Sequence, residues 1–210
     1  GGDLEGIIDK ADYLKAIGIT AVWLSPLFEQ VDDIEHGHGP MHGYWTRDFK
    51  RVNPHFVKLG ESTSLRTCTT LQRMIEALHE RGIRIVLDIV CNHSSPDLHG
   101  SKGVVTDDGK PLADFYNDAN HFYHHYPVIT DWNDEFQLIH HEMLGLATFN
   151  ERNIEFRNYI KSAIMAWLES QPWCTGKVGM IGISWGGFNG LQVAARRPEQ
   201  LKAVISICSS

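Results

Sequence analysis

The sequence predicts an α/β protein in which helices alternate with apolar, parallel strands. Residues 4–17 and 69–81 place apolar side chains at helical spacing, and each pattern stops at a glycine. Each is followed by a short apolar run, at residues 19–27 and 83–91. Because continuously apolar strands that follow helices are typical of parallel sheets, this order indicates a parallel α/β sheet or barrel.

The two N-terminal helices are predicted from apolar stripes on one face. These stripes are Ile7, Ile8, Ala11 and Leu14, followed by Leu71, Met74, Ile75 and Leu78. The runs ITAVWLSPL and IRIVLDIVC that come after them are predicted to be buried strands. Between the two pairs, residues 29–66 are rich in Gly, His and Pro and are predicted to form a long loop region.

The pattern changes after the second strand. Residues 94–145 are polar and aromatic, and a segment of this length is typical of a functional loop or a small subdomain. Residues 154–168 return to a helix with one apolar face. The last part of the chain predicts a strand over 178–183, a helix over 187–197 and a strand over 201–208.

The composition is that of a soluble globular protein. The 210 residues are 42% hydrophobic and 21% charged, enough for one large domain or two small ones. A net charge of −7 without a run of Lys or Arg argues against nucleic acid as a partner. No apolar stretch approaches the ~20 residues that span a bilayer, so no membrane partner is expected. The first residues, GGDLEGII, form no signal peptide pattern and leave the localisation open.

Cysteine and histidine spacing predicts no metal motif. The four cysteines form no CxxC pair and lie at Cys68, Cys91, Cys174 and Cys208. Several of the 12 histidines are grouped, as at His121, His124, His125, His140 and His141. None of these groups has the helical HExxH spacing of a zinc site, so most of the histidines are interpreted as surface residues.

Two groups of residues are candidates for a sugar site. Functional residues of parallel barrels cluster where strands end, and Asp88, Asn92 and His93 fall at or just past the end of the second strand. Upstream, HGYWTRDF at residues 42–49 combines aromatic rings with groups that hydrogen-bond in a plane. These are Tyr44, Trp45, Arg47 and Asp48. A pyranose offers an apolar face for stacking and hydroxyls for hydrogen bonds, so both groups suit a carbohydrate.

Four segments of the chain resemble the α-amylase family, glycoside hydrolase family 13, and within it the cyclodextrin glucanotransferase-like branch. They are GDLEGIIDKADYLKAIGITAVWLSPLF, HGYWTRDF, IRIVLDIVCNHSSP and LATFNERNIEFRNYIKSAIMAWL. The resemblance implies a partial (β/α) barrel over residues 1–93, an inserted loop subdomain over 94–145 and a barrel helix over 146–170. It also implies binding of, or action on, α-1,4-glucans such as starch and maltooligosaccharides.

The same resemblance implies roles for individual residues. Tyr44 would stack on the sugar at the cleavage site, and His93 would hydrogen-bond sugar hydroxyls. Asp88 would brace the strand end and an arginine partner. The implied substrate-binding set is His42, Tyr44, Trp45, Asp88 and His93. Asn92 would ligate a structural calcium ion.

The chain departs from this family pattern at two places. The second calcium ligand, an Asp in the family pattern LADLN, is Thr148 in LATFN. The strand that should carry the Asp nucleophile is replaced by KVGMIGISWGG, which contains no carboxylate, although glycoside hydrolysis needs two positioned carboxylates. Other carboxylates are candidates for recruitment, namely Asp131, Asp134, Glu135 and Glu142.

The C-terminal segment, residues 171–210, carries a different motif. Gly182-Ile183-Ser184-Trp185-Gly186 is a GxSxG sequence between a predicted strand and a predicted helix, the arrangement of a nucleophile elbow. The segment resembles the nucleophile region of the cocaine-esterase and X-Pro dipeptidyl-peptidase family of α/β-hydrolases. By this resemblance Ser184 is the acyl nucleophile and the Trp185 N–H an oxyanion donor, and the Asp and His of the triad would follow residue 210.

The chain is therefore interpreted as a fusion of two enzyme fragments that meet near residues 168–172. The favoured hypothesis is a glycoside-hydrolase-like protein for α-1,4-glucans. The alternatives are a serine esterase or peptidase that uses Ser184, and an inactive sugar-binding fusion fragment. An α-glucan is the expected partner, and self-association is expected because an open partial barrel exposes apolar edges.

Overall fold

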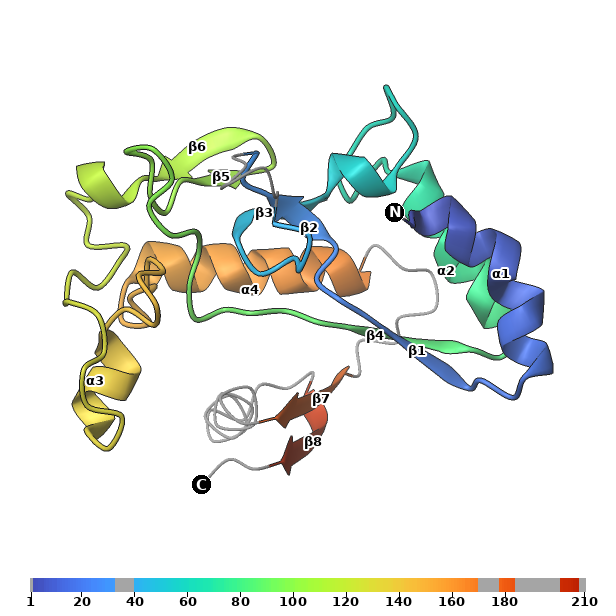
Figure 1. Cartoon of the computed structure of the whole chain (residues 1–210). Coiled ribbons are helices and arrows are strands. Elements are labelled where there is room, and N and C mark those ends of the chain that lie inside the picture. The colour runs from blue at the N-terminus through green and yellow to red at the C-terminus, as the bar shows by residue number, and fades with distance from the viewer. Residues whose placement is uncertain (1, 33–39, 170–177, 184–200, 208–210) are drawn as a thin grey trace. The chain divides into compact units, whose positions relative to one another are not determined.

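The computed structural model describes residues 2–32, 40–169, 178–183 and 201–207 (Figure 1). It divides into two compact units, Gly1–Trp167 and Leu168–Ser210. Within the described residues, no helix is both long and apolar enough to cross a membrane.

The two N-terminal helices that the sequence predicts are present in the first unit, where they pack side by side (Figure 1). Helix α1 spans Leu4–Ala16 and begins at Asp3, whose side chain accepts the Gly6 N–H at 2.8 Å. Helix α2 spans Thr69–Glu80. Each is followed within two residues by a glycine of positive φ, which lets the chain reverse toward a strand.

The strands that follow these helices form a parallel pair. Strand β1, Ala21–Leu24, pairs with β4, Arg84–Leu87, residue for residue. Their positions and parallel direction confirm the sequence prediction, but the prediction of burial is wrong. The side chains of both strands are half-buried or exposed, because the described sheet contains only these two strands.

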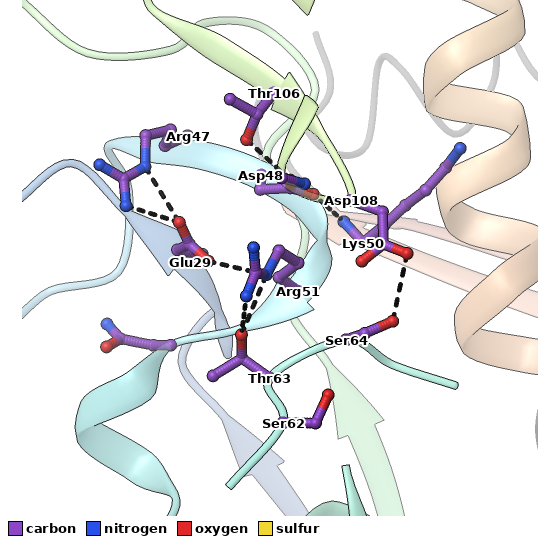
Figure 2. A network of polar contacts seen from close by, with 12 residues as sticks. Glu29, Arg47, Asp48, Lys50, Arg51, Ser62, Thr63, Ser64, Thr106 and Asp108 are labelled. Atoms are coloured by element: carbon purple, nitrogen blue, oxygen red, sulfur yellow. Dashed lines mark hydrogen bonds and ion pairs between the residues drawn. The ribbon is translucent and has the colours of Figure 1, made fainter. Parts of the chain in front are cut away.

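The prediction that residues 29–66 form only a loop is also wrong. Strand β2, Phe28–Gln30, pairs antiparallel with β3, Thr46–Val52, and a 3₁₀ turn, η1, follows at Pro54–Phe56. The β3 sequence TRDFKRV has too few apolar residues to give a strand signal. Its polar side chains instead form a network of ion pairs and hydrogen bonds with β2 and with the loop around Thr63 (Figure 2).

Residues 94–145 contain short elements of their own. Strands β5, Val105–Asp107, and β6, Lys110–Ala113, form a hairpin whose turn residues, Asp108 and Gly109, both have positive φ. A 3₁₀ turn, η2, spans Phe115–Asn117, and helix α3 spans Glu135–His140.

Helix α4, Ile154–Glu169, is fixed to the first unit through the tips of two aromatic side chains. The Tyr159 hydroxyl donates to the Thr106 carbonyl at 2.8 Å and accepts the Phe49 N–H at 2.9 Å. The Trp167 indole N–H donates to the Phe49 carbonyl at 2.7 Å. The rings of Phe28, Phe49 and Trp167 pack together in the core beside these bonds.

In the second unit, strand β7, Val178–Ile183, pairs in parallel with β8, Leu201–Ile207. Both strands lie where the sequence predicts them. The predicted helix over 187–197, the connector before β7 and the elbow residues Ser184 and Trp185 lie outside the described residues.

Candidate functional site

The candidate site lies where strands β1 and β4 end. Gly43 has a φ of +83°, and a Cβ atom there would lie 2.7 Å from the Pro26 carbonyl oxygen, so only glycine allows this approach to the chain after β1. The Ser94 hydroxyl donates to the Thr46 carbonyl at 2.9 Å, which joins the chain after β4 to the start of β3. The two sequence motifs are thus held against each other at the carboxyl ends of parallel strands, the usual place for a site in α/β folds.

Asp88 joins two aromatic side chains at this edge. The Tyr44 hydroxyl donates to Asp88 Oδ2 at 3.1 Å, and the Trp23 indole N–H approaches the same oxygen at 3.4 Å. These aromatic groups, rather than an arginine, are the hydrogen-bond partners of Asp88 within the described part of the chain. Burial and the Asp88 charge raise the pKa of Tyr44, so its hydroxyl remains a donor. The Tyr44 side chain is 38% exposed and leaves a ring surface for a ligand.

His42 packs between the rings of Tyr44 and Trp45. It stacks on Tyr44 with centroids 5.7 Å apart and meets Trp45 edge-on at 4.9 Å. Its Nδ1 accepts the Tyr44 N–H at 2.9 Å, which places the proton of the neutral ring on Nε2. Loss of solvent lowers the pKa of His42 and favours this neutral form. Trp45 is half-buried and contacts the His42 ring, and its contact with sugar stays a prediction.

His93 supplies a polar atom that is not satisfied by the described residues. Its side chain is buried, with 5% exposure, and its Nε2 has no hydrogen-bond partner among them. Burial lowers the pKa of His93 to about 4, although the Tyr44 backbone opposes the shift. The ring is therefore neutral at pH 7. Since a buried polar atom without a partner is costly, a ligand hydroxyl at Nε2 would be stabilising.

Two residues proposed from sequence to contact sugar serve the fold instead. Arg47 forms ion pairs with Glu29 at 2.6 Å and Asp32 at 2.7 Å (Figure 2 shows the first). Asp48 is fully buried and accepts hydrogen bonds from the Thr106 hydroxyl and the Gly109 N–H. The prediction that Asp48 hydrogen-bonds sugar is wrong, because its carboxylate joins β3 to the β5–β6 hairpin.

The calcium position implied for Asn92 has a poor donor set. Asn92 and Thr148 lie near each other, since His93 and Thr148 form a β-bridge. The Thr148 side chain is buried, however, and its hydroxyl donates to the His141 carbonyl at 3.1 Å. Ca²⁺ prefers six to eight oxygen ligands that include carboxylates. The residues present do not fit this ion, and the function proposed below does not depend on it.

Three of the four carboxylates considered as replacements for the catalytic pair are engaged locally. Asp131 accepts the Asn133 N–H at 2.9 Å, and Asp134 caps α3. Glu142 is buried in an ion pair with Lys102 at 2.6 Å. The carboxylate that the described structure brings to Tyr44 is Asp88 alone. This geometry suits sugar binding, whereas hydrolysis needs a second carboxylate.

One group of ligand-type residues was missed from the sequence. His124, His140 and Glu151 each place a nitrogen or oxygen atom within 4.8 Å of the others. The spacing rules applied to the histidines find ligands one helical turn apart. Here the three residues come from separate segments, so only the folded chain brings them together.

Two known protein families match the chain, one over the part that carries the sugar-site motifs and the other over the part that carries the GxSxG motif. Residues 1–172 match the family described as the α-amylase catalytic domain, and residues 160–210 match the X-Pro dipeptidyl-peptidase (S15) family. A cyclomaltodextrin glucanotransferase from Thermoanaerobacterium thermosulfurigenes is 35% identical over 181 residues, which cover 80% of this chain and 24% of that protein. An α-amylase from Niallia circulans is 33% identical over 180 residues, covering 80% of this chain and 32% of that protein.

Solved structures agree with the sequence relatives. A γ-cyclodextrin glucanotransferase from the alkalophilic Bacillus clarkii superposes with a TM-score of 0.75 at 32% identity, covering 97% of this chain and 29% of that one. An α-amylase from Geobacillus thermoleovorans, solved with acarbose, gives 0.62 at 30% identity and covers 86% of this chain and 34% of that one. The fold is therefore of the α-amylase (β/α) type, and the chain spans 24% to 34% of the length of these curated relatives and solved structures.

Proposed function

The chain belongs to the α-amylase family, and on this premise we propose that its first unit binds α-1,4-glucans at the site formed by Tyr44, Asp88 and His93. The observation that carries the proposal is the buried, unpaired Nε2 of His93 at the edge where Tyr44 offers an exposed ring. A pyranose satisfies both, with its apolar face on Tyr44 and a hydroxyl at His93. The acarbose complex of one structural relative and the names of the glucanotransferase relatives support the same ligand class.

The proposal is tested by titrating the protein with a maltooligosaccharide in a calorimeter. Tyr44→Ala and His93→Ala should each weaken binding by about tenfold or more, which is the loss of roughly 1.4 kcal/mol expected for a stacking face or a buried hydrogen bond. Tyr13→Ala is the matched control, since Tyr13 is an exposed tyrosine on α1. Equal affinity in all four proteins would show that the glucan does not bind at this site.

A second candidate is a serine hydrolase that uses Ser184. It is favoured by the match of residues 160–210 to the S15 family and by the parallel pairing of β7 and β8, with Ser184 next after β7. In such a strand–turn–helix unit, the Trp185 N–H would serve the oxyanion.

Turnover of soluble starch and of a nitrophenyl ester, by the wild type and by Ser184→Ala, separates the candidates. Starch cleavage by both proteins would assign hydrolysis to the amylase-like part. Ester cleavage that disappears in Ser184→Ala would assign activity to the second unit. No turnover of either substrate, with maltooligosaccharide binding retained, would identify an inactive sugar-binding protein.

A further inference from the structure

Two histidines and a glutamate, none of them a residue of the glucan site, meet beside helix α3. His124 follows the buried Tyr123, His140 ends α3, and Glu151 lies three residues before α4. His124 Nε2 and Glu151 Oε2 are 2.7 Å apart, and a nitrogen of His140 lies within 4.8 Å of both. We refer to these three residues as the His124 cluster.

Contacts outside the cluster orient the His140 imidazole, and the His124 imidazole is buried. His140 Nδ1 lies 2.9 Å from the Phe136 carbonyl oxygen, to which it must donate, so Nε2 is the nitrogen left with a lone pair. The His140 ring also stacks on Phe136, with centroids 4.3 Å apart. His124 is buried, and its backbone N–H donates to the Thr148 carbonyl at 2.9 Å. The His140 ring is thus held by contacts that a bound ion would leave in place, and the His124 ring meets it edge-on with centroids 4.8 Å apart.

The third member of the cluster carries the charge. A glutamate is ionised at neutral pH, and Glu151 Oε2 accepts a hydrogen bond from His124 Nε2 at 2.7 Å. Arg152 lies 3.5 Å from Glu151 Oε1, while Oε2 is the oxygen that faces His124.

We propose that His124, His140 and Glu151 bind a zinc ion. Two imidazole nitrogens and one carboxylate oxygen form the donor set of a three-ligand zinc site, in which water takes the fourth position. Tetrahedral zinc with bonds of ~2.0–2.1 Å needs ligand atoms roughly 3.4 Å apart. The present separations reach this value with small side-chain movements, and the ion would replace the His124–Glu151 hydrogen bond.

Bound zinc would join three separate parts of the first unit. It would tie the C-terminal end of α3 and the chain around His124 to the segment that leads into α4. None of its ligands is among the residues implied for calcium or proposed for the glucan site. Zinc binding and glucan binding therefore use different side chains.

Zinc chloride titrated into the chelator-treated full chain tests this site by calorimetry, with Co²⁺ absorption as a second readout. One ion per chain is expected to bind, and His140→Gln and Glu151→Gln should each bind it at least about tenfold more weakly. His125→Gln is the matched control, since His125 is the adjacent histidine and pairs with Asp118 instead. It should bind zinc like the wild type. Circular dichroism of each variant verifies that it is folded.

Three results would overturn the assignment. The wild type could fail to bind zinc, His140→Gln and Glu151→Gln could both bind it as tightly as the wild type, or His125→Gln could lose binding while the cluster variants keep it. The last result would move the ion to the His125–Asp118 pair.

Discussion

At the scale of single residues, Asp48 stabilises the fold, although the sequence predicts that its motif, HGYWTRDF, binds a sugar. Its buried carboxylate accepts hydrogen bonds from the Thr106 hydroxyl, the Gly109 N–H and the Lys50 N–H, at 2.7 to 2.8 Å (Figure 2 includes it). These bonds join β3 to the hairpin of β5 and β6. The backbone N–H groups would be left without this acceptor if the carboxylate were removed.

Asp48→Ala is expected to lower the free energy of unfolding by about 3 kcal/mol, because hydrogen bonds to a buried charged group are lost together. Urea unfolding followed by circular dichroism measures the change. Asp107→Ala is the control, since Asp107 forms a more exposed ion pair with Lys50 and should cost at most about 1 kcal/mol. Equal losses in the two variants would contradict the structural role given to Asp48.

The sequence places Tyr44 in one motif and Asp88 and His93 in another, at a strand end, and the fold brings the two motifs together. That these residues bind sugar stays a prediction. The sequence did not predict the His124 cluster, whose members lie 16 and 11 residues apart along the chain. No periodic pattern marks such a group, because irregular segments and a short helix position it.

At the scale of elements, α1 and α2 were predictable because an apolar stripe and a terminal glycine both mark a helix. Strand β3 was not, since its stability comes from ion pairs such as Arg47 with Glu29 rather than from an apolar face. The start of α2 illustrates the same limit. Cys68 makes no side-chain cap, and the cap comes from Glu61 in the preceding loop.

Glu61 makes the stability of α2 depend on pH. Burial raises its pKa, but hydrogen bonds from Thr70 and Thr69 prevail and lower it to about 2. In the unfolded chain the pKa is near 4.5, so between pH 4.5 and 2 the unfolded state binds more protons. The stabilisation by Glu61 is therefore complete above pH 4.5 and is lost as the pH falls toward 2.

Glu61→Gln should cost about 2 kcal/mol of unfolding free energy at pH 7 and remove this part of the acid dependence. Thermal or urea unfolding at pH 7, 4.5 and 3 gives the comparison. Glu80→Gln, at the exposed end of α2, should leave both quantities close to those of the wild type. A Glu61→Gln variant that loses stability in acid as steeply as the wild type would show that another group is responsible.

At the scale of the whole molecule, the chain belongs to the α-amylase family and its C-terminal part matches a second family, the two matches overlapping at residues 160–172. The local motifs of the sequence predict both resemblances. The apolar runs of β1 and β4 could not predict that this parallel pair is exposed, because the burial of a strand depends on how many strands join the sheet. Trp23 of β1 is 55% exposed, although the apolar sequence of its strand predicts burial.

The exposed β1–β4 pair is expected to drive self-association. Sedimentation velocity should show a sedimentation coefficient that rises with protein concentration, because apolar strand faces are removed from water by a second copy. Trp23→Gln should suppress the rise, whereas Trp132→Gln should not, although Trp132 is equally exposed. A concentration-independent value for the wild type would contradict the expectation.

The anchoring of α4 has a consequence for how such a chain can arise. Its bonds to Phe49 and Thr106 come from Tyr159 and Trp167, and both residues precede the boundary between the two units. A foreign sequence grafted after residue 167 would keep each of these bonds, provided that it continued the helix. The helix therefore offers a point of exchange at which genes of unrelated enzymes can be recombined without loss of the contacts that hold the first partner.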